Sequence, residues 1–409
     1  MHQEVCPMKK MLPLFLVLCM AVCCLSPALA QEEITVPELT ITRREIPDNE
    51  AMAFLKAMGV GWNLGNTFDA IKGDWNRNAD EMTVEKSWCQ VYTTEEMIAA
   101  IHDAGFTSIR IPASWHDHVS GENHEISAQW MDRVQEVVNW AYDRGMYVIL
   151  NIHHDEEQFL PSPAHYEASA HYVECIWKQI AERFRDYDDH LILESLNEPR
   201  LLNSPYEWWI DPNVQECQEA IDCLNRLNQL FVDTVRSDGG NNAKRYLMVP
   251  GYDASPENAV RDSFLLPTDT VENRLIVSVH AYTPYSFALD MNPGTSVSTF
   301  GDQQQKQDIV YFMNNLYNQY ILKGIPVVIG EYGALKKGDN VQDRVDWTAF
   351  YVATASARNL PCLWWDNNAF SGNGEKFGLL NRQDVSFPYP KIVEAIMTYG
   401  GYEKLPEAK

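Results

Sequence analysis

The sequence predicts an α/β protein folded as a single-domain (β/α)8 barrel, the TIM-barrel architecture, and three observations indicate it. Eight short segments rich in Val and Ile are apolar almost throughout, which is typical of strands buried on both faces of a parallel sheet. Segments with helical periodicity separate these strands. The alternation spans most of the 409-residue chain, enough for eight strand–helix pairs. A doubly wound open sheet is the alternative, but GWNLGN (61–66) lacks the Gly-rich helix opening that such sheets normally carry.

The expected strands are short and follow one another at similar spacing. In chain order they cover residues 60–66, 106–112, 146–154, 191–199, 246–252, 275–282, 326–333 and 361–367. Thr93-Thr94-Glu95-Glu96 has the pattern of a capping box for a first helix, which Gly105 ends. Ser127 is the expected N-cap of a second helix, which Gly145 ends. Further helices are expected near residues 168–186, 214–237, 303–323, 342–359 and 388–399.

The N-terminus has the pattern of a secretory signal peptide at residues 1–30. Lys9 and Lys10 precede the apolar residues 11–25, and Pro-Ala-Leu-Ala ends at Ala30 as an A-x-A-like cleavage signal. The apolar run is too short and wrongly flanked for a stable membrane span, with a retained anchor as the alternative. We therefore expect a secreted protein, extracellular or periplasmic. Residues 31–50 are then a polar tether or short edge strand, and residues 51–402 form the (β/α)8 catalytic domain.

Charge and cysteine usage narrow the function classes. The formal net charge of −25 argues against nucleic acid and anionic membranes as partners and suits a soluble, monomeric, secreted protein with a neutral substrate. Of the nine cysteines, four lie in the predicted signal peptide. The other five are odd in number and scattered, so we expect no metal site, no disulfide framework and at most one or two bridges. No cofactor is expected.

Polar and aromatic side chains end six of the expected strands. In a barrel of this kind the active site is the ring formed by the carboxyl ends of the strands, so these residues converge on one face. They are Arg110, His153, His154, Asn197, Glu198, His280, Tyr282, Glu331, Trp364 and Trp365.

Two of these residues are carboxylates, Glu198 and Glu331, on the fourth and seventh expected strands. Two acids across a sugar-sized gap are what glycoside cleavage needs, because one protonates the leaving oxygen while the other attacks or stabilises the oxocarbenium-like centre. Arg110 and Tyr282 can hold one acid ionised as a nucleophile. The other acid must keep its proton near the working pH, which a less polar setting favours.

Other residues of the ring suit sugar binding. His153 and Asn197 can donate to sugar hydroxyls, and Asn197 stands beside Glu198 to hold the 2-hydroxyl. Trp365 is the preferred floor under a sugar ring, since Trp364 should point the other way in an extended segment. Either packing or a sugar platform would explain the aromatic residues of the expected loops, which are Trp75, Trp115, Trp208, Trp209 and Phe370.

At these residues the sequence resembles glycoside hydrolase family 5, the old cellulase family A. The matching stretches, in order, are GWNLGNTFDA, IRIPASW, YVILNIHHD, ESLNEPR, VHAY, VVIGEYGA and LWWDN, which together span about residues 50–400. NIHHD, LNEPR and EWW are most similar to the bacterial subfamily 4, whose members are endo-β-1,4-glucanases that often also cleave xyloglucan and mixed-linkage glucan.

The resemblance implies roles for the site residues. Glu198 matches the acid/base and Glu331 the nucleophile of this retaining family. The supporting positions match Arg110, His153, Asn197, His280, Tyr282 and Trp365, and His154 is a further sugar-contacting candidate.

Fold and acids do not fix the sugar, so three functions stay open. The first is a secreted endo-β-1,4-glucanase, and the second is an endo-xyloglucanase or endo-β-mannanase on the same barrel. The third is a catalytically silent glycan-binding protein, whose mark would be the loss of one acid, and both acids are present.

Overall fold

The computed structural model describes residues 33–73 and 78–407, and residues from Ile34 onward form one compact unit. The predicted signal peptide and Trp75 lie outside the described residues. Within the described residues, no helix has both the length and the apolar character needed to cross a membrane.

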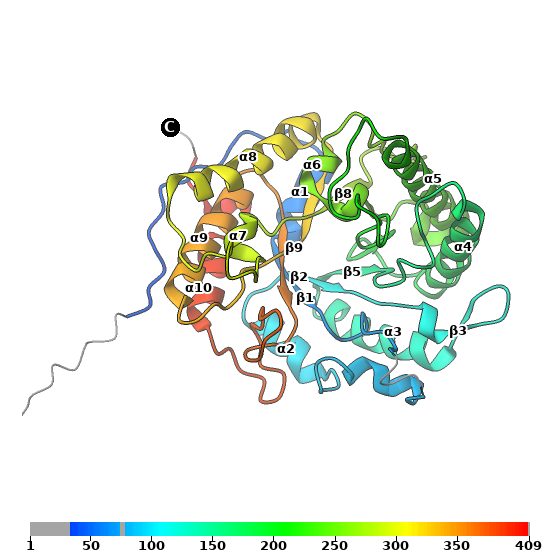
Figure 1. The fold of residues 1–409 in the computed structure, drawn as a ribbon, viewed down its shortest axis with the longest axis horizontal. Helices are drawn as coiled ribbons and strands as arrows, with labels where there is room; N and C mark the ends of the chain where they lie inside the picture. Colours follow the sequence, from blue (N-terminus) through cyan, green and yellow to red (C-terminus); the bar gives the residue numbers. More distant parts are fainter. Residues whose placement is uncertain (1–32, 74–77, 408–409) are drawn as a thin grey trace, which may run out of the picture. The chain divides into compact units, whose positions relative to one another are not determined.

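The centre of the fold is a closed barrel of eight parallel strands in the order β1-β10-β9-β8-β7-β6-β5-β2 (Figure 1). Every strand interior is buried on both faces, as the apolar segments predict. The barrel strands are β1 (Val60–Leu64), β2 (Ser108–Ile111), β5 (Tyr147–Asn151), β6 (Leu191–Glu194), β7 (Leu247–Pro250), β8 (Leu275–His280), β9 (Val327–Tyr332) and β10 (Cys362–Asp366). The (β/α)8 prediction is confirmed.

Helices form the outer layer of the barrel, and Figure 1 shows α4 and α5 side by side on one flank with α8, α9 and α10 on the opposite one. The α-helices are α1 (Glu50–Met58), α2 (Glu95–Asp103), α3 (Ala128–Tyr142), α4 (Tyr166–Arg183), α5 (Gln215–Asp238), α6 (Pro256–Ala259), α7 (Tyr285–Ala288), α8 (Gln303–Gln319), α9 (Val341–Ser356) and α10 (Pro390–Tyr399). Short 3₁₀ helices occupy Glu81–Lys86, His116–His118, Gly240–Ala243, Tyr252–Ala254, Ile321–Lys323 and Tyr402–Lys404. A small hairpin, β3 (Val119–Ser120) with β4 (Glu125–Ile126), projects after β2.

Two strands end earlier than expected, and this places the site residues in loops. β6 stops at Glu194, although the Ser195 N–H still donates to the Met248 carbonyl at 2.9 Å. Beyond that bond the chain leaves the sheet, so Asn197 and Glu198 stand on the loop above it. β5 likewise ends at Asn151, before the two histidines.

The N-terminal capping predicted for two helices, α2 and α3, differs from what the structure shows. The N-cap of α2 is Thr94, whose side chain accepts from the Met97 N–H, so the predicted box on Thr93 is wrong. The Thr93 N–H instead donates to Glu85 at 2.8 Å. Ser127 does stand at the N-cap of α3, but its hydroxyl donates to Glu81 at 3.0 Å rather than capping the helix.

Helix α1 closes the amino end of the barrel, and the sequence patterns did not indicate it. Its N-cap Asn49 donates to the Gly324 carbonyl just before β9, and the Asn359 side chain before β10 donates to the Met52 carbonyl. Phe54 stacks on Tyr246 with ring centres 3.7 Å apart. These contacts leave the carboxyl end of the barrel as the open one.

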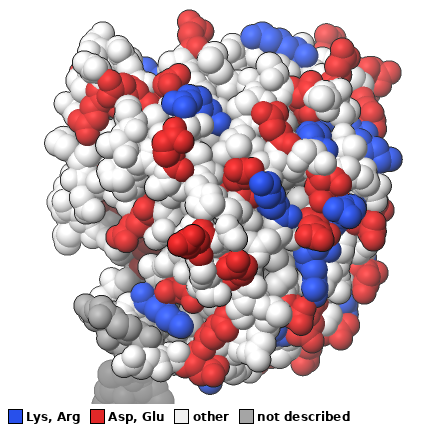
Figure 2. Space-filling model, turned by 90° about the vertical axis from the view of Figure 1, so that its right-hand side faces the viewer, with Lys and Arg blue, Asp and Glu red and all other residues white. Residues whose placement is uncertain are grey.

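Charged side chains are mixed over the face of the molecule that carries α4 and α5 (Figure 2). Figure 2 shows acidic and basic side chains interspersed over the face that carries α4 and α5, without a basic patch on that face. All five cysteines in the described part of the chain are unpaired.

Candidate active site

Arg110 is the centre of the site at the carboxyl end of the barrel. Its side chain is fully buried on β2. Its Nε donates to Glu194 at 2.7 Å, its Nη1 to Glu331 at 2.7 Å and to Asn63 at 3.1 Å, and its Nη2 to Asn197 at 2.8 Å. Burial would lower the pKa of the guanidinium, but the two carboxylates raise it overall, so Arg110 is a fixed positive charge.

Glu331, on β9, is held through both of its oxygens. Oε1 accepts from Arg110, and Oε2 accepts from the Tyr282 hydroxyl at 2.7 Å. Burial and the Glu331 charge raise the pKa of Tyr282 well above its ordinary value, so the phenol keeps the proton that it donates. The carboxylate is thereby oriented by two donors and presented toward the cleft, as a nucleophile requires.

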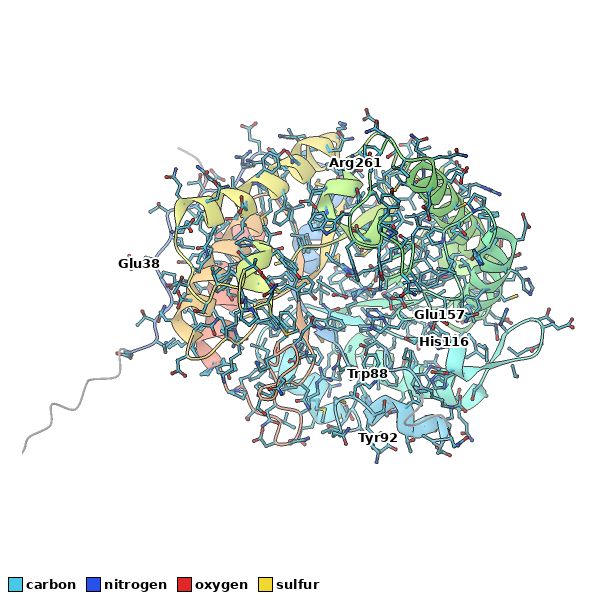
Figure 3. The ribbon with its side chains drawn as sticks, viewed as in Figure 1. Glu38, Trp88, Tyr92, His116, Glu157 and Arg261 are labelled. Carbon is cyan, nitrogen blue, oxygen red and sulfur yellow. The ribbon has the colours of Figure 1, made fainter. Side chains whose placement is uncertain are left out.

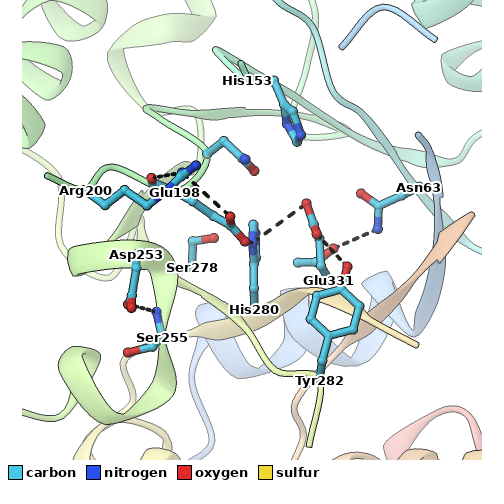
Figure 4. A network of polar contacts seen from close by, with 12 residues as sticks. Asn63, His153, Glu198, Arg200, Asp253, Ser255, Ser278, His280, Tyr282 and Glu331 are labelled. Atoms are coloured by element: carbon cyan, nitrogen blue, oxygen red, sulfur yellow. Dashed lines mark hydrogen bonds and ion pairs between the residues drawn. The ribbon is translucent and has the colours of Figure 1, made fainter. Parts of the chain in front are cut away.

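Glu198 has a different partner, His280 at the end of β8. The His280 Nδ1 lies 2.8 Å from Glu198 Oε1, while its Nε2 faces the Arg110 Nη2 at 3.4 Å (Figure 4). Arginine only donates, so Nε2 accepts and Nδ1 carries the hydrogen that binds Glu198. Burial raises the pKa of the Glu198 carboxyl, but His280 and Arg200 lower it by more. The net pKa therefore lies below its usual value.

This differs from the expectation that a less polar setting keeps the proton on Glu198. The physical reason is His280: burial lowers its pKa, but Glu331 and Glu198 raise it to a net value above the ordinary one. Glu198 is therefore the acceptor in the sugar-free site, and a proton lies one hydrogen bond away on Nδ1.

The two carboxylates stand close together across the cleft. One oxygen of Glu198 and one of Glu331 lie within 4.8 Å of each other, with a His280 nitrogen equally near. These three residues, and separately Asp69, His153 and His154, have donor atoms of metal-binding types. The acids of both sets already accept hydrogen bonds from the protein. Glu331 accepts from Arg110 and Tyr282, and Asp69 accepts from the Asn66 and Thr67 N–H groups.

His153 and Trp365 lie side by side in the structure. Their ring planes are parallel within 2° with centres 5.7 Å apart. Burial lowers the pKa of His153 well below its ordinary value, so the ring is neutral. Trp364 is fully buried and donates through Nε1 to the Phe377 carbonyl at 3.0 Å, so its side chain is used in packing.

Trp88, His116 and Glu157 are labelled at the lower right of Figure 3, and the His154 ring lies beside that of Trp88. The His154 Nδ1 is 3.2 Å from Glu156, and its ring centre is 5.7 Å from that of Trp88. Its ring is half-buried.

The sequence reasoning missed Glu194, the fully buried acid in LILES. Besides Arg110, it accepts from Ser278 at 2.6 Å and from Asn151 at 3.1 Å. The signal was available, because an arginine inside a buried strand needs a buried counter-charge and the neighbouring strands offer few acids.

The loop aromatic residues divide between packing and exposure. Trp115 is fully buried and donates to the Asn151 carbonyl at 3.0 Å, and Phe370 packs beside Tyr389. Trp208 and Trp209 are 49% and 81% exposed.

Comparison with known proteins identifies the family of this chain. Residues 72–371 match the family profile described as cellulase, glycosyl hydrolase family 5. The chain belongs to this family. It is therefore a glycoside hydrolase by descent, and the resemblance drawn from its motifs is confirmed.

Relatives cover nearly the whole chain. Endoglucanase B of Ruminococcus albus is 42% identical over 372 residues, covering 90% of this chain and 85% of that protein. A solved family 5 lichenase from Caldicellulosiruptor sp. F32, a Glu-to-Gln mutant in complex with cellotetraose, is 52% identical with a TM-score of 0.88. That match covers 90% of this chain and all of the other. A subfamily 4 broad-specificity endoglucanase from Ruminococcus champanellensis with bound cellotriose is 44% identical, with a TM-score of 0.80 over 87% of this chain and all of the other.

Proposed function

We propose that this protein is a secreted, retaining endo-β-1,4-glucanase that hydrolyses internal bonds of β-glucans, including cellulose and mixed-linkage glucan. The observation that carries the proposal is the pair of carboxylates within 4.8 Å, one held by Arg110 and Tyr282 and the other by His280. Retaining glycosidases have carboxyl groups about 5–5.5 Å apart, whereas inverting ones need about 6.5–9.5 Å to admit a water molecule.

The first step forms a covalent intermediate. Glu331 Oε attacks the anomeric carbon, the bond to the leaving oxygen breaks, and Glu198 gives that oxygen its proton. The Glu198 carboxylate that remains accepts the hydrogen bond from His280 Nδ1 and regains its proton only in the second step. Arg110 and Tyr282 keep Glu331 aligned until its charge is neutralised in the new ester.

The second step releases the enzyme. Glu198, now a base, takes a proton from water, the water oxygen bonds to the anomeric carbon, and Glu331 leaves as a carboxylate. Two inversions at one carbon give net retention. Arg110 again faces the returning negative charge, which favours departure of Glu331.

A mixed-linkage glucan is the preferred substrate within this class, because a solved relative that is 52% identical is described as a lichenase. The test is reducing-sugar release from carboxymethylcellulose, mixed-linkage β-glucan, xyloglucan and mannan side by side. We expect the fastest release from β-glucan and some from carboxymethylcellulose. Release from mannan alone would refute the substrate class.

Retention is tested separately by proton NMR of the first product from a β-glucan oligosaccharide. A β-anomer appearing before mutarotation supports the double displacement. An α-anomer appearing first would show that the two carboxylates act by a single displacement.

A further inference from the structure

Arg200 lies two residues after Glu198 and binds it in two ways. The Arg200 Nη1 donates to the Glu198 carbonyl at 2.8 Å and lies 3.9 Å from Glu198 Oε2 (Figure 4). The same nitrogen lies 3.2 Å from Glu156 on the loop after β5. Only 12% of the Arg200 side chain is exposed, so these contacts are shielded from solvent.

The other side of Arg200 holds the loop between β6 and α5. Its Nε lies 3.4 Å from Glu207, whose other oxygen accepts from the Asn203 N–H at 3.1 Å. Its guanidinium carbon stands 4.2 Å from the centre of the Trp208 ring. One side chain thus connects Glu198 to an exposed indole.

Trp208 and Trp209 are the exposed tryptophans of the described chain, and Trp209 is 81% exposed. Two adjacent exposed indoles form an apolar surface of the kind that marks a binding site, and the C–H face of a sugar stacks well on an aromatic ring. The loop that carries them begins at the acid/base. Since this residue protonates the leaving oxygen, its loop borders the side where the leaving sugars lie.

We propose that Arg200 is a positioning residue that couples leaving-side sugars on Trp208 and Trp209 to the placement and proton affinity of Glu198. The coupling rests on the proposed glucanase function. A sugar stacked on the other face of Trp208 holds the indole against the guanidinium. Arg200 in turn fixes the Glu198 backbone through its hydrogen bond to the carbonyl. Its positive charge favours the ionised form of the Glu198 carboxyl and so weakens proton binding there.

The charge role is tested by the pH profile of kcat/KM for Arg200→Ala and Arg200→Lys. A general acid loses activity above its pKa, and removing a nearby cation raises that pKa, so the alkaline limb of Arg200→Ala should move upward by roughly one pH unit. Arg200→Lys keeps the charge and should leave that limb near its wild-type position. Thermal unfolding of both variants shows whether they are folded.

The stacking role is tested with Trp209→Ala and Trp208→Ala against Tyr311→Ala, an aromatic on α8 whose exposed fraction lies between those of the two tryptophans. With cellopentaose the Trp variants should lose about three- to tenfold in kcat/KM, the worth of one aromatic contact. With an aryl cellobioside, which places no sugar on the leaving side, they should match wild type. Arg200→Lys should share the cellopentaose loss, because an ammonium does not stack flat on an indole.

Two results would overturn the coupling while leaving the glucanase assignment intact. One is an unmoved alkaline limb in folded Arg200→Ala. The other is a set of Trp variants that behave as Tyr311→Ala does on both substrates. A wild-type protein that releases no sugar from any β-glucan would instead overturn the proposed function itself.

Discussion

Glu198 and Glu331 differ in their partners, and this difference predicts different mutants. Both Glu198→Gln and Glu331→Gln should lose nearly all hydrolysis of unactivated glucan, because each removes one half of the acid–nucleophile pair. With an aryl glycoside whose leaving group needs no proton, Glu198→Gln should still show a burst of released phenol, whereas Glu331→Gln should not. Stopped-flow measurement of the burst decides this, and equal loss on both substrate types would reverse or remove the assigned roles.

Glu194 predicts a stability effect at the same site. Glu194→Gln leaves Arg110 buried with one counter-charge fewer, and breaking a buried ion pair typically costs about 3–5 kcal/mol. Urea unfolding should show that loss. Glu174→Gln is the matched control, because its ion pair with Lys178 is exposed and should contribute about 0–1 kcal/mol. An unchanged midpoint in Glu194→Gln would contradict the account of Arg110.

His280 predicts a pH dependence of stability. Its pKa is raised in the folded state, so its contribution is present at low pH and is lost as pH rises through that raised value. The Glu198 pKa is lowered, so its contribution is present above its unfolded value and is lost as pH falls through the lowered one. The pair therefore stabilises the fold most between these two pKa values.

Replacing the imidazole should flatten this curve. In His280→Gln the free energy of unfolding, measured by urea at several pH values, should fall less on both sides of the window than in wild type. His190→Gln removes an exposed histidine instead and should keep the wild-type shape. A wild-type curve that is already flat from acid to alkaline pH would contradict the pairing.

At the scale of elements, α1 is a packing helix rather than part of the site. Phe54→Ala removes the stack on Tyr246 and should lower stability by about 3–5 kcal/mol, as for other buried aromatics. Because α1 covers the amino end of the barrel, the KM and the pH profile of the remaining folded enzyme should not change. Leu322→Ala, at an exposed position, is the control. A changed KM in Phe54→Ala would show that the two ends communicate.

The positions of the strands could be predicted from the sequence, whereas the residues at which the strands end could not. Burial on both faces gives an apolar run that is visible without neighbours, so all eight strands were located. Where each strand stops depends on bonds to the next strand, such as that from Ser195 to Met248, which no local pattern encodes. The same holds for α2, where Glu85 binds the Thr93 N–H and moves the cap to Thr94.

At the scale of the whole molecule, the convergence of Arg110, Glu198 and Glu331 followed from strand order alone. Parallel strands bring their carboxyl ends to one face, so polar residues at those ends must meet. The hydrogen bond between His280 and Glu198 could not be found in this way. It depends on a distance between two strand ends that only the closed ring determines.

Export of the whole protein is a prediction from residues 1–30. We expect secreted material to begin near Gln31, because the apolar run is followed by Ala-Leu-Ala. Intact-mass spectrometry of the secreted protein is the measurement. An intact Met1, or lipid on Cys23 or Cys24, would contradict it.

The pairing of β1 with β10 sets an order on how this chain can fold during synthesis. The first and last strands of the ring meet along five residue pairs, so the ring cannot close until residue 366 has left the ribosome. Helix α1 has the same limitation, since its partners precede β7, β9 and β10. Such distant contacts form slowly. A nascent chain therefore stays open through most of its translation, which is the condition a translocation channel needs to thread it.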